Sequence, residues 1–237
     1  MHVAILGLGP SLETFVNVAK RLGGVRAYCD EVWGINAVGG VIQCDKIFHM
    51  DDVRIQETRA AAAPESNIAN MMKWLKTTHT QVITSRTHPD YPALQAFPLQ
   101  EVMDHLRYDY FNNTAAYALA YAIHIGVDKV SLYGCDYTYP DAHDAEKGRG
   151  CLEFWLGQAA ARGIAIALPK NTSLMDALHT QQERLYGYDT VDISMDVDAN
   201  NRIRVTQTPH ARRMNAEELE ARYDHGVHPN VLVSGAS

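Results

Sequence analysis

Short apolar runs, each closed by polar residues, recur along most of the chain. They cover residues 2–8, 31–36, 46–50, 81–85, 129–133 and 164–168. Runs of this length that end on polar or turn-forming residues are typical of buried strands, and they are too short to span a bilayer. The pattern therefore predicts a sheet whose strands are buried.

Helical spacing of apolar residues separates several of these runs. The predicted helices cover residues 12–22, 65–76, 114–125 and 151–162. Gly126 and Gly163 follow the last two segments, as expected where helices end. Strands that alternate with helices imply a parallel sheet, because parallel strands need crossover connections. We expect an α/β fold with a single doubly wound, mainly parallel, Rossmann-like sheet and helices on both faces.

The pattern changes in the last part of the chain. Residues 191–197 and 203–205 alternate apolar and polar side chains around a turn-forming segment at 198–201, which predicts a β-hairpin. Asn215, followed three residues later by Glu218, resembles a helix start. We expect a Rossmann-like catalytic domain that binds a nucleotide or nucleotide-sugar over residues 1–185, and a hairpin and helix extension over 186–237 that packs on it.

Length, charge and cysteine spacing narrow the classes of protein. The 237 residues suffice for one large domain. The net charge of −7 disfavours nucleic acid as a partner, because broad contact with a phosphate backbone needs clustered Lys and Arg. The four cysteines form no CxxC pair and are expected to be buried thiols. Met1 and His2 lead directly into an apolar run without a cationic leader, so we expect a cytoplasmic protein with no membrane partner.

Polar residues at the ends of the first strands are the first site candidates, because ligands of open parallel sheets bind beyond the carboxyl ends of the strands. Gly7 and Gly9 allow a close backbone approach, and the amides around Ser11 could face a phosphate. A plain strand-to-helix turn is the alternative, and the third glycine of a dinucleotide fingerprint is absent. Asn36 ends the second strand with an amide suited to a base or ribose edge, or it is an ordinary turn residue.

Two further groups of polar residues have both a binding and a capping interpretation. Asp51 and Asp52 end the third strand and could hold Mg²⁺ with phosphate oxygens, although one of them could instead cap a helix. Asn112, Asn113 and Thr114 begin the long alanine-rich helix. Capping explains one of these three, and contact with an anion or ribose would explain a second.

A polar segment, predicted to be a loop over residues 134–150, follows the strand at 129–133. It carries Asp136, Tyr137, Tyr139, Asp141 and His143. His143 could act as a general base, and Tyr137 or Tyr139 could donate a hydrogen bond to a leaving phosphate. A solvated loop histidine is the alternative for His143.

Several of these segments resemble a known family. The run Ile5-Leu6-Gly7-Leu8-Gly9-Pro10-Ser11-Leu12 is similar to the first strand and GxGPSL turn of bacterial lipooligosaccharide sialyltransferases. The further matching segments are Gly34-Ile35-Asn36, Tyr110-Phe111-Asn112 with the helix after it, Tyr133-Gly134-Cys135-Asp136, and Pro169-Lys170-Asn171-Thr172-Ser173-Leu174. The likeness covers most of residues 1–178. More loosely, the chain resembles the MptE-like family of 6-hydroxymethylpterin diphosphokinases.

The sialyltransferase resemblance implies roles for individual residues. In that family a histidine nine residues before the leucine of a Leu-Glu-Phe helix is the catalytic base, and His143 stands nine before Leu152. Tyr137 and Tyr139 are candidates for the family's phosphate-binding tyrosines. By the same resemblance, the donor nucleotide would contact Gly7, Gly9, Ser11, Asn36 and Thr114 (serine in the family). Further candidates for contact with the donor are Pro10 in the same turn, Asn113 at the helix start and Asp136 at the strand end.

These observations favour a glycosyltransferase that uses a nucleotide-activated, CMP-linked sugar, with His143 as general base and no required cofactor. The acceptor is not specified, and a homo-oligomer stays open. The pterin kinase resemblance gives the alternative of a Mg-ATP-dependent diphosphokinase, in which Asp51, Asp52 and Asp136 would hold the metal. A further alternative is a non-catalytic nucleotide-binding module.

Overall fold

The computed structural model describes residues 1–138, 142–179, 184–188, 191–200, 202–209 and 215–221. The chain divides into two compact units, Met1–Leu178 and His179–Ser237. The predicted boundary after residue 185 therefore falls inside the second unit. The packing of the tail on the first unit stays a prediction.

In the first unit, seven described strands form one sheet in the order β5-β4-β3-β2-β1-β6-β7, and every neighbouring pair is parallel. They are β1 (His2–Leu6), β2 (Glu31–Ile35), β3 (Lys46–Phe48), β4 (Gln81–Thr84), β5 (Leu94–Ala96), β6 (Lys129–Tyr133) and β7 (Ala165–Ala167). Strands β2 to β5 follow one another outward on one side of β1, and β6 then pairs with the other side of β1. The strand order thus reverses between β1 and β6, which is the switch point of a doubly wound sheet.

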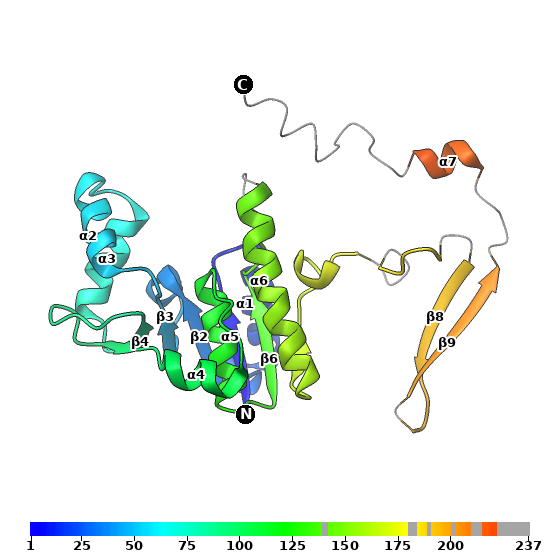
Figure 1. Cartoon of the computed structure of the whole chain (residues 1–237), viewed down its shortest axis with the longest axis horizontal. Helices are drawn as coiled ribbons and strands as arrows, with labels where there is room; N and C mark the ends of the chain where they lie inside the picture. The colour runs from blue at the N-terminus through cyan, green and yellow to red at the C-terminus, as the bar shows by residue number, and fades with distance from the viewer. Residues whose placement is uncertain (139–141, 180–183, 189–190, 201, 210–214, 222–237) are drawn as a thin grey trace. The chain divides into compact units, whose positions relative to one another are not determined.

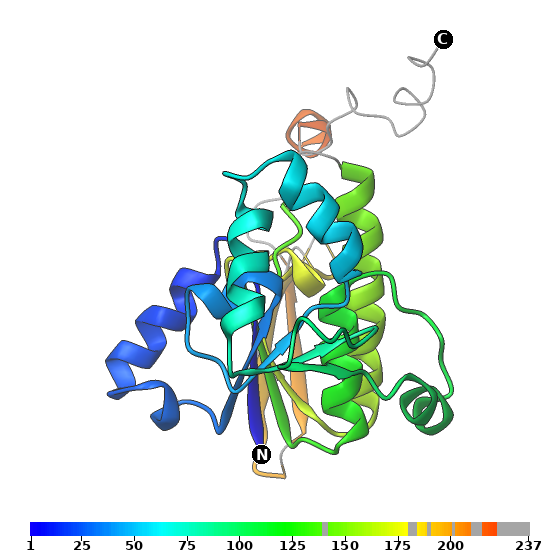
Figure 2. The same ribbon diagram turned by 90° about the vertical axis from the view of Figure 1, so that its left-hand side faces the viewer.

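Helices cover both faces of this sheet, as predicted from the sequence. The α-helices of the unit are α1 (Leu12–Leu22), α2 (Val53–Ala62), α3 (Asn67–Thr77), α4 (Leu99–Leu106), α5 (Thr114–His124) and α6 (Ala142–Ala161). Short 3-10 helices are η1 (Val25–Ala27), η2 (Asn36–Gly40) and η3 (Leu174–Asp176). Figure 1 shows the α-helices along the sheet, and Figure 2 shows α1 on one side with α5 and α6 on the other.

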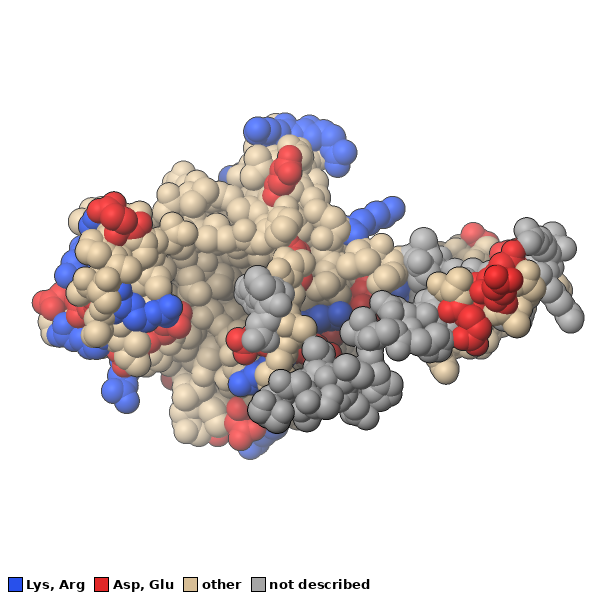
Figure 3. Space-filling view, turned by 90° about the horizontal axis from the view of Figure 1, so that it is seen from above, with Lys and Arg blue, Asp and Glu red and all other residues tan. Residues whose placement is uncertain are grey.

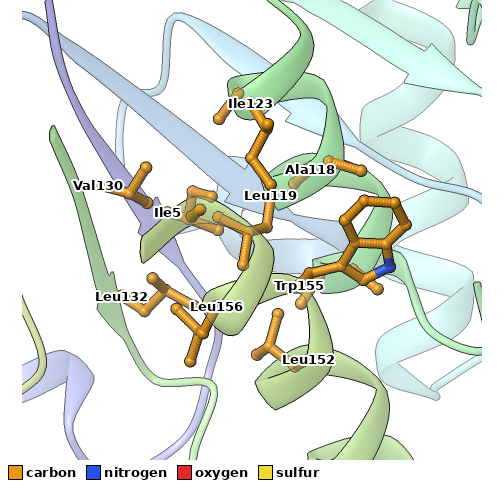
Figure 4. Close-up of a cluster of buried hydrophobic side chains, with 14 of the residues drawn as sticks. Ile5, Ala118, Leu119, Ile123, Val130, Leu132, Leu152, Trp155 and Leu156 are labelled. Carbon is orange, nitrogen blue, oxygen red and sulfur yellow. The ribbon is translucent and has the colours of Figure 1, made fainter. Parts of the chain in front are cut away.

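Alternate residues of each strand point to opposite faces, and this alternation builds two cores. Val3 and Ile5 of β1 belong to the core under α4, α5 and α6, whereas Ala4 and Leu6 belong to the core under α1 and α3. Figure 4 shows part of the first core, where Ile5 lies among side chains of α5, α6 and β6. The nearly continuous burial of β1 follows from this two-sided cover.

The prediction of a polar loop over residues 134–150 holds for residues 134–138 but is wrong from Ala142 onward, where α6 begins. Gly148 and Gly150 each lower helix propensity by about 1 kcal/mol relative to alanine, so the sequence pattern indicated a loop. Tertiary contacts outweigh this cost: the Tyr137 ring packs so closely on Gly148 that a Cβ there would lie 2.5 Å from it, and Arg149 forms an ion pair with Asp176 of η3 at 2.7 Å. Helices α2 and α4 and strand β5 were also not predicted.

The strand predicted at 164–168 is present as β7 but is not buried as expected. It lies at the edge of the described sheet, where Ala165 is exposed and Ile166 is half-buried. The cysteines, in contrast, are buried and unpaired as predicted. No helix in the described part of the chain has the length and apolarity needed to cross a membrane.

The second unit contains the predicted hairpin, β8 (Val191–Val197) paired antiparallel with β9 (Ile203–Pro209). It also contains the short helix α7 (Ala216–Glu220). The Glu218 amide donates to Asn215 Oδ1 at 2.8 Å, and the Asn215 amide donates to Glu218 Oε2 at 3.0 Å. These reciprocal bonds are the capping box that the sequence predicted.

The loops that follow β1 and β6 approach each other so closely that only glycine fits. A Cβ at Gly7 would overlap the carbonyl oxygen of Gly134, and a Cβ at Gly134 would overlap the backbone of Gly7. At Gly9, a Cβ would lie 2.7 Å from Asp136 Oδ2. Gly134 also has a φ of +70°, in the left-handed region that favours glycine. This close contact forms at the switch point of the sheet.

We predict that Gly134→Ala destabilises the protein by about 3 kcal/mol, since it combines backbone strain with overlap against a rigid neighbour. The matched control is Gly157→Ala in α6, where an added Cβ meets nothing within 4 Å. The control should raise the free energy of unfolding by up to about 1 kcal/mol. Urea unfolding of both variants measures the difference, and equal stability of the two would contradict this account of the contact.

Candidate active site

A cleft of about 490 Å³ opens at the carboxyl edge of the sheet. Segments that follow β1, β2, β3 and β6 line it together with the start of α5. Its lining residues are Gly7, Leu8, Gly9, Ile35, Asn36, Asp51, Asn113, Thr114, Ala115, Gly134, Cys135, Asp136, Tyr137 and Thr138. Figure 3 looks down on this edge and shows a hollowed tan area to the right of the charged margin.

The cleft brings together most of the site candidates taken from the sequence. Those that line it are Gly7, Gly9, Asn36, Asp51, Asn113, Thr114, Asp136 and Tyr137. They come from segments far apart in the chain, and the parallel sheet gathers them because its strand ends share one edge. Ser11 lies beneath the lining and is fully buried, whereas Pro10 is exposed and outside it.

Buried hydrogen bonds between Ser11, Asp136 and Gly134 lie at the base of the cleft. Asp136 is 2% exposed and accepts two hydrogen bonds from Ser11, from the amide at 2.7 Å and from Oγ at 2.6 Å. Ser11 Oγ in turn accepts from the Gly134 amide at 2.6 Å. A buried carboxylate is tolerated when donors meet its oxygens, and here both oxygens have a donor from Ser11.

The amides of the glycine turn are engaged within the protein. The Gly7 amide donates to the Tyr133 carbonyl at 2.7 Å, and the Gly9 amide donates to the Gly134 carbonyl at 2.8 Å. The Ser11 amide donates to Asp136, so it does not face a ligand phosphate as the sequence suggested. The turn serves to join β1 to β6, and it presents a surface without side chains at Gly7 and Gly9.

The start of α5 is the part of the cleft best suited to an anion. Asn113 caps this helix, since its Oδ1 accepts from the Ala116 amide at 2.9 Å. Thr114 and Ala115 form the first turn and line the cleft. A helix N-terminus attracts negative charge through its unpaired amides and its dipole. The described lining contains no Lys or Arg, so this helix end is its source of positive potential.

Tyr137 lies between the cleft and α6. It has a φ of +49°, which is uncommon for a residue with a side chain. Its hydroxyl donates to Asn113 Oδ1 at 3.1 Å, and its ring packs on Gly148 of α6. Asn113 Nδ2 donates to the Gly148 carbonyl at 3.1 Å. The start of α5, Tyr137 and α6 are thereby held as one group.

Asn36 stands at the end of β2 in a left-handed conformation, with a φ of +52°. Its Oδ1 lies 3.1 Å from Nδ1 of His49, which follows β3 and is completely buried. His49 Nδ1 is 4.0 Å from Asp51 Oδ2. Burial lowers the pKa of His49 below its usual value, and the nearby Asp51 only partly opposes this effect.

The three aspartates considered for a metal are placed differently. Asp51 and Asp136 line the cleft, but Asp52 does not. Asp52 caps α2 by accepting from the Arg54 amide at 2.8 Å, which is the capping role that the sequence left open. Among the residues that the structure describes, no group of three or more His, Cys, Asp or Glu is placed to hold a metal ion.

Of the remaining site candidates, His143 and Asn112 are described by the structure and do not line the cleft. His143 is exposed in the first turn of α6 and is not a lining residue. Tyr139 and Asp141 lie outside the described residues. Asn112 is exposed, and its Nδ2 donates to the Lys147 carbonyl of α6 at 2.9 Å.

Sequence reasoning did not select Leu8, Cys135 or His49. Leu8 and Cys135 are in the lining, and burial raises the pKa of the Cys135 thiol to about 12, so this group stays protonated. His49 directly follows the apolar residues of β3 and precedes the acidic pair at 51–52. The sequence signal that could have pointed to His49 is its place between a buried strand and two carboxylates.

No family model matches the chain, and no curated protein matches it. Among solved structures, similar ones include the sialyltransferase CstII from Campylobacter jejuni with cytidine-5'-monophosphate. That match has 14% identity and a TM-score of 0.43, and covers 76% of this chain and 87% of the other. The same enzyme with CMP-3FNeuAc gives 12% identity and a TM-score of 0.46, covering 93% of this chain and 98% of the other.

A third similar structure is CST-II with a trisaccharide acceptor and CMP. It has 11% identity and a TM-score of 0.44, and covers 94% of this chain and 98% of the other. At such TM-scores these likenesses are no argument for the fold or the function. The fold is established by the sheet, and the site is defined by the cleft, both described above.

We predict that Ser11→Ala destabilises the protein by about 3 kcal/mol, because it leaves the buried Gly134 amide and one oxygen of Asp136 without their partner. The exposed Ser85, at the end of β4, provides the matched control, and Ser85→Ala should change stability by less than about 0.5 kcal/mol. Urea unfolding with unchanged m-values measures both. A Ser11→Ala variant as stable as its control would refute the role of the Ser11 and Asp136 pair.

Proposed function

We propose that this protein is a glycosyltransferase that takes a sugar from a nucleotide-activated, CMP-linked donor. The observation that carries the proposal is the cleft at the switch point between β1 and β6, where doubly wound sheets bind nucleotides. Its volume of about 490 Å³ is in the usual range for a small-molecule site. The motif resemblance to lipooligosaccharide sialyltransferases supports the choice of donor.

The polar groups of the cleft suggest how the donor lies. Gly7 and Gly9 of the turn after β1 line the cleft, so the donor can lie against their backbone. Asn36 offers its amide to the base or ribose, and Thr114 and Ala115 at the start of α5 take the phosphate. This orientation places the anionic part of the donor at the helix end and away from the Asp51 carboxylate.

In the transfer step the acceptor oxygen attacks the anomeric carbon of the sugar, and the bond from that carbon to the phosphate oxygen breaks. His143 takes the proton of the acceptor hydroxyl, and CMP leaves with the electron pair of the broken bond. Tyr137 or Tyr139 steadies the charge that grows on the phosphate. Tyr137 suits this role by position, since its hydroxyl lies beside Asn113 at the start of α5, and the hydrogen that it donates there would turn to the phosphate.

We also propose that donor binding requires no metal. Asp136 accepts from Ser11 with both oxygens, and Asp52 is engaged as the cap of α2. Asp51 is therefore the carboxylate that remains open to other partners in the cleft. A Mg-ATP-dependent diphosphokinase would need several such oxygens on one ion, so the site favours the glycosyltransferase proposal.

The test is His143→Ala, assayed by release of CMP from a CMP-linked sugar donor. Loss of a general base should lower kcat by about two to four powers of ten and leave the Kd for CMP unchanged, since the base acts in the transition state. His79, an exposed residue that precedes β4 at the opposite edge of the sheet, provides the matched control. His79→Ala should keep full activity.

Three outcomes of this assay would count against the proposal. A His143→Ala variant with parental kcat would show that His143 is not the general base. A parent protein that binds CMP without consuming any donor would favour a non-catalytic binding module. An affinity for CMP that collapses in EDTA would point to a metal on Asp51 and Asp136 and to phosphoryl transfer.

A further inference from the structure

His49 is a buried polar residue without a role in the proposed transfer step. Its exposed fraction is 0%, and it follows β3 directly beneath the cleft residues Asn36 and Asp51. Its backbone amide donates to the Ile83 carbonyl of β4 at 2.8 Å, which fixes the position of its backbone. A polar ring buried in this way costs free energy unless its nitrogens are hydrogen-bonded, so the partners of each nitrogen decide its state.

The contact with Asn36 determines which ring nitrogen carries the proton. Nδ1 of His49 lies 3.1 Å from Oδ1 of Asn36, and an amide oxygen can only accept, so Nδ1 is the donor. Nε2 has no hydrogen-bond partner among the described residues. Buried acceptors without a partner are better tolerated than buried N–H groups, which favours the tautomer with its proton on Nδ1.

The surroundings of His49 keep the ring neutral. Asp51, 4.0 Å from Nδ1, is the charged group in contact range. Burial lowers the pKa of His49 by more than Asp51 raises it. Thr84 follows the paired positions Phe48 and Ile83 of β3 and β4, and its buried hydroxyl has no hydrogen-bond partner among the described residues.

We propose that His49 is a positioning residue that fixes the side-chain amide of Asn36, so that Nδ2, a donor, faces the cleft. Since Oδ1 is engaged with the buried ring, Nδ2 is the polar atom that the Asn36 side chain offers to a ligand. The ligand atom that meets Asn36 is then a hydrogen-bond acceptor, such as a carbonyl oxygen or an unprotonated ring nitrogen of the base. This inference about recognition rests on the proposed binding of a nucleotide.

The tautomer itself is measured on the ligand-free protein. Long-range proton–nitrogen NMR spectra of ¹⁵N-labelled protein at neutral pH distinguish the two neutral tautomers and the imidazolium, and His49→Asn assigns the signal. We expect His49 as the neutral ring with its proton on Nδ1. A neutral ring with its proton on Nε2 would turn the carbonyl of Asn36 to the cleft and overturn the proposal.

The consequence for binding is measured with CMP and two variants of His49. His49→Leu removes the donor to Asn36 and should raise the Kd for CMP about tenfold, the loss expected for one hydrogen bond. His49→Asn keeps an N–H donor near the position of Nδ1 and should recover most of the affinity. Thr84→Val, the control for a neighbouring buried polar group, should leave the Kd unchanged.

The readouts separate positioning from a general loss of structure. A His49→Leu variant that retains the parental Kd for CMP would contradict the proposal, and equal losses in His49→Leu and His49→Asn would do the same. Thermal unfolding of each variant shows whether any loss of affinity follows stability instead. If the parent protein binds no CMP, the proposed function fails, and the tautomer measurement alone decides the role of His49.

Discussion

The contact between the loops after β1 and β6 is the constraint on which the rest of the site depends. Gly7 and Gly134 meet backbone to backbone, and no residue with a side chain fits at either position without displacing the other strand end. Ser11 and Asp136 hold this contact through three buried hydrogen bonds that involve both loops. The switch point of the sheet is therefore a packed, hydrogen-bonded junction whose upper surface forms part of the cleft.

This junction determines which polar groups of the cleft remain available to bind a ligand. Because the amides of Gly7, Gly9 and Ser11 are engaged within the protein, binding specificity falls on groups from neighbouring elements. Asn36 supplies an amide from the end of β2, and the start of α5 supplies helix-end amides. A cleft of this kind suits a ligand that has an acceptor at one end and an anion at the other.

The sequence predicted the sheet well because strands buried on both faces are nearly continuous apolar runs, and polar residues mark where each one ends. It also placed the capping box at Asn215 and the gathering of the strand-end residues in one cleft. Its failures came where contacts distant in sequence outweigh local preference. The start of α6 was missed because Gly148 lowers helix propensity, and the contact that requires this glycine, the Tyr137 ring, is visible only in the fold.

The central claim is that a nucleotide binds at the junction of β1 and β6, and a crystal structure of the protein with CMP tests it most directly. The account predicts CMP across Gly7 and Gly9, with Asn36 beside the base or ribose and the phosphate at the start of α5. CMP bound instead in the separate hollow between α2 and α3, lined by Glu57 and Lys76, would contradict it.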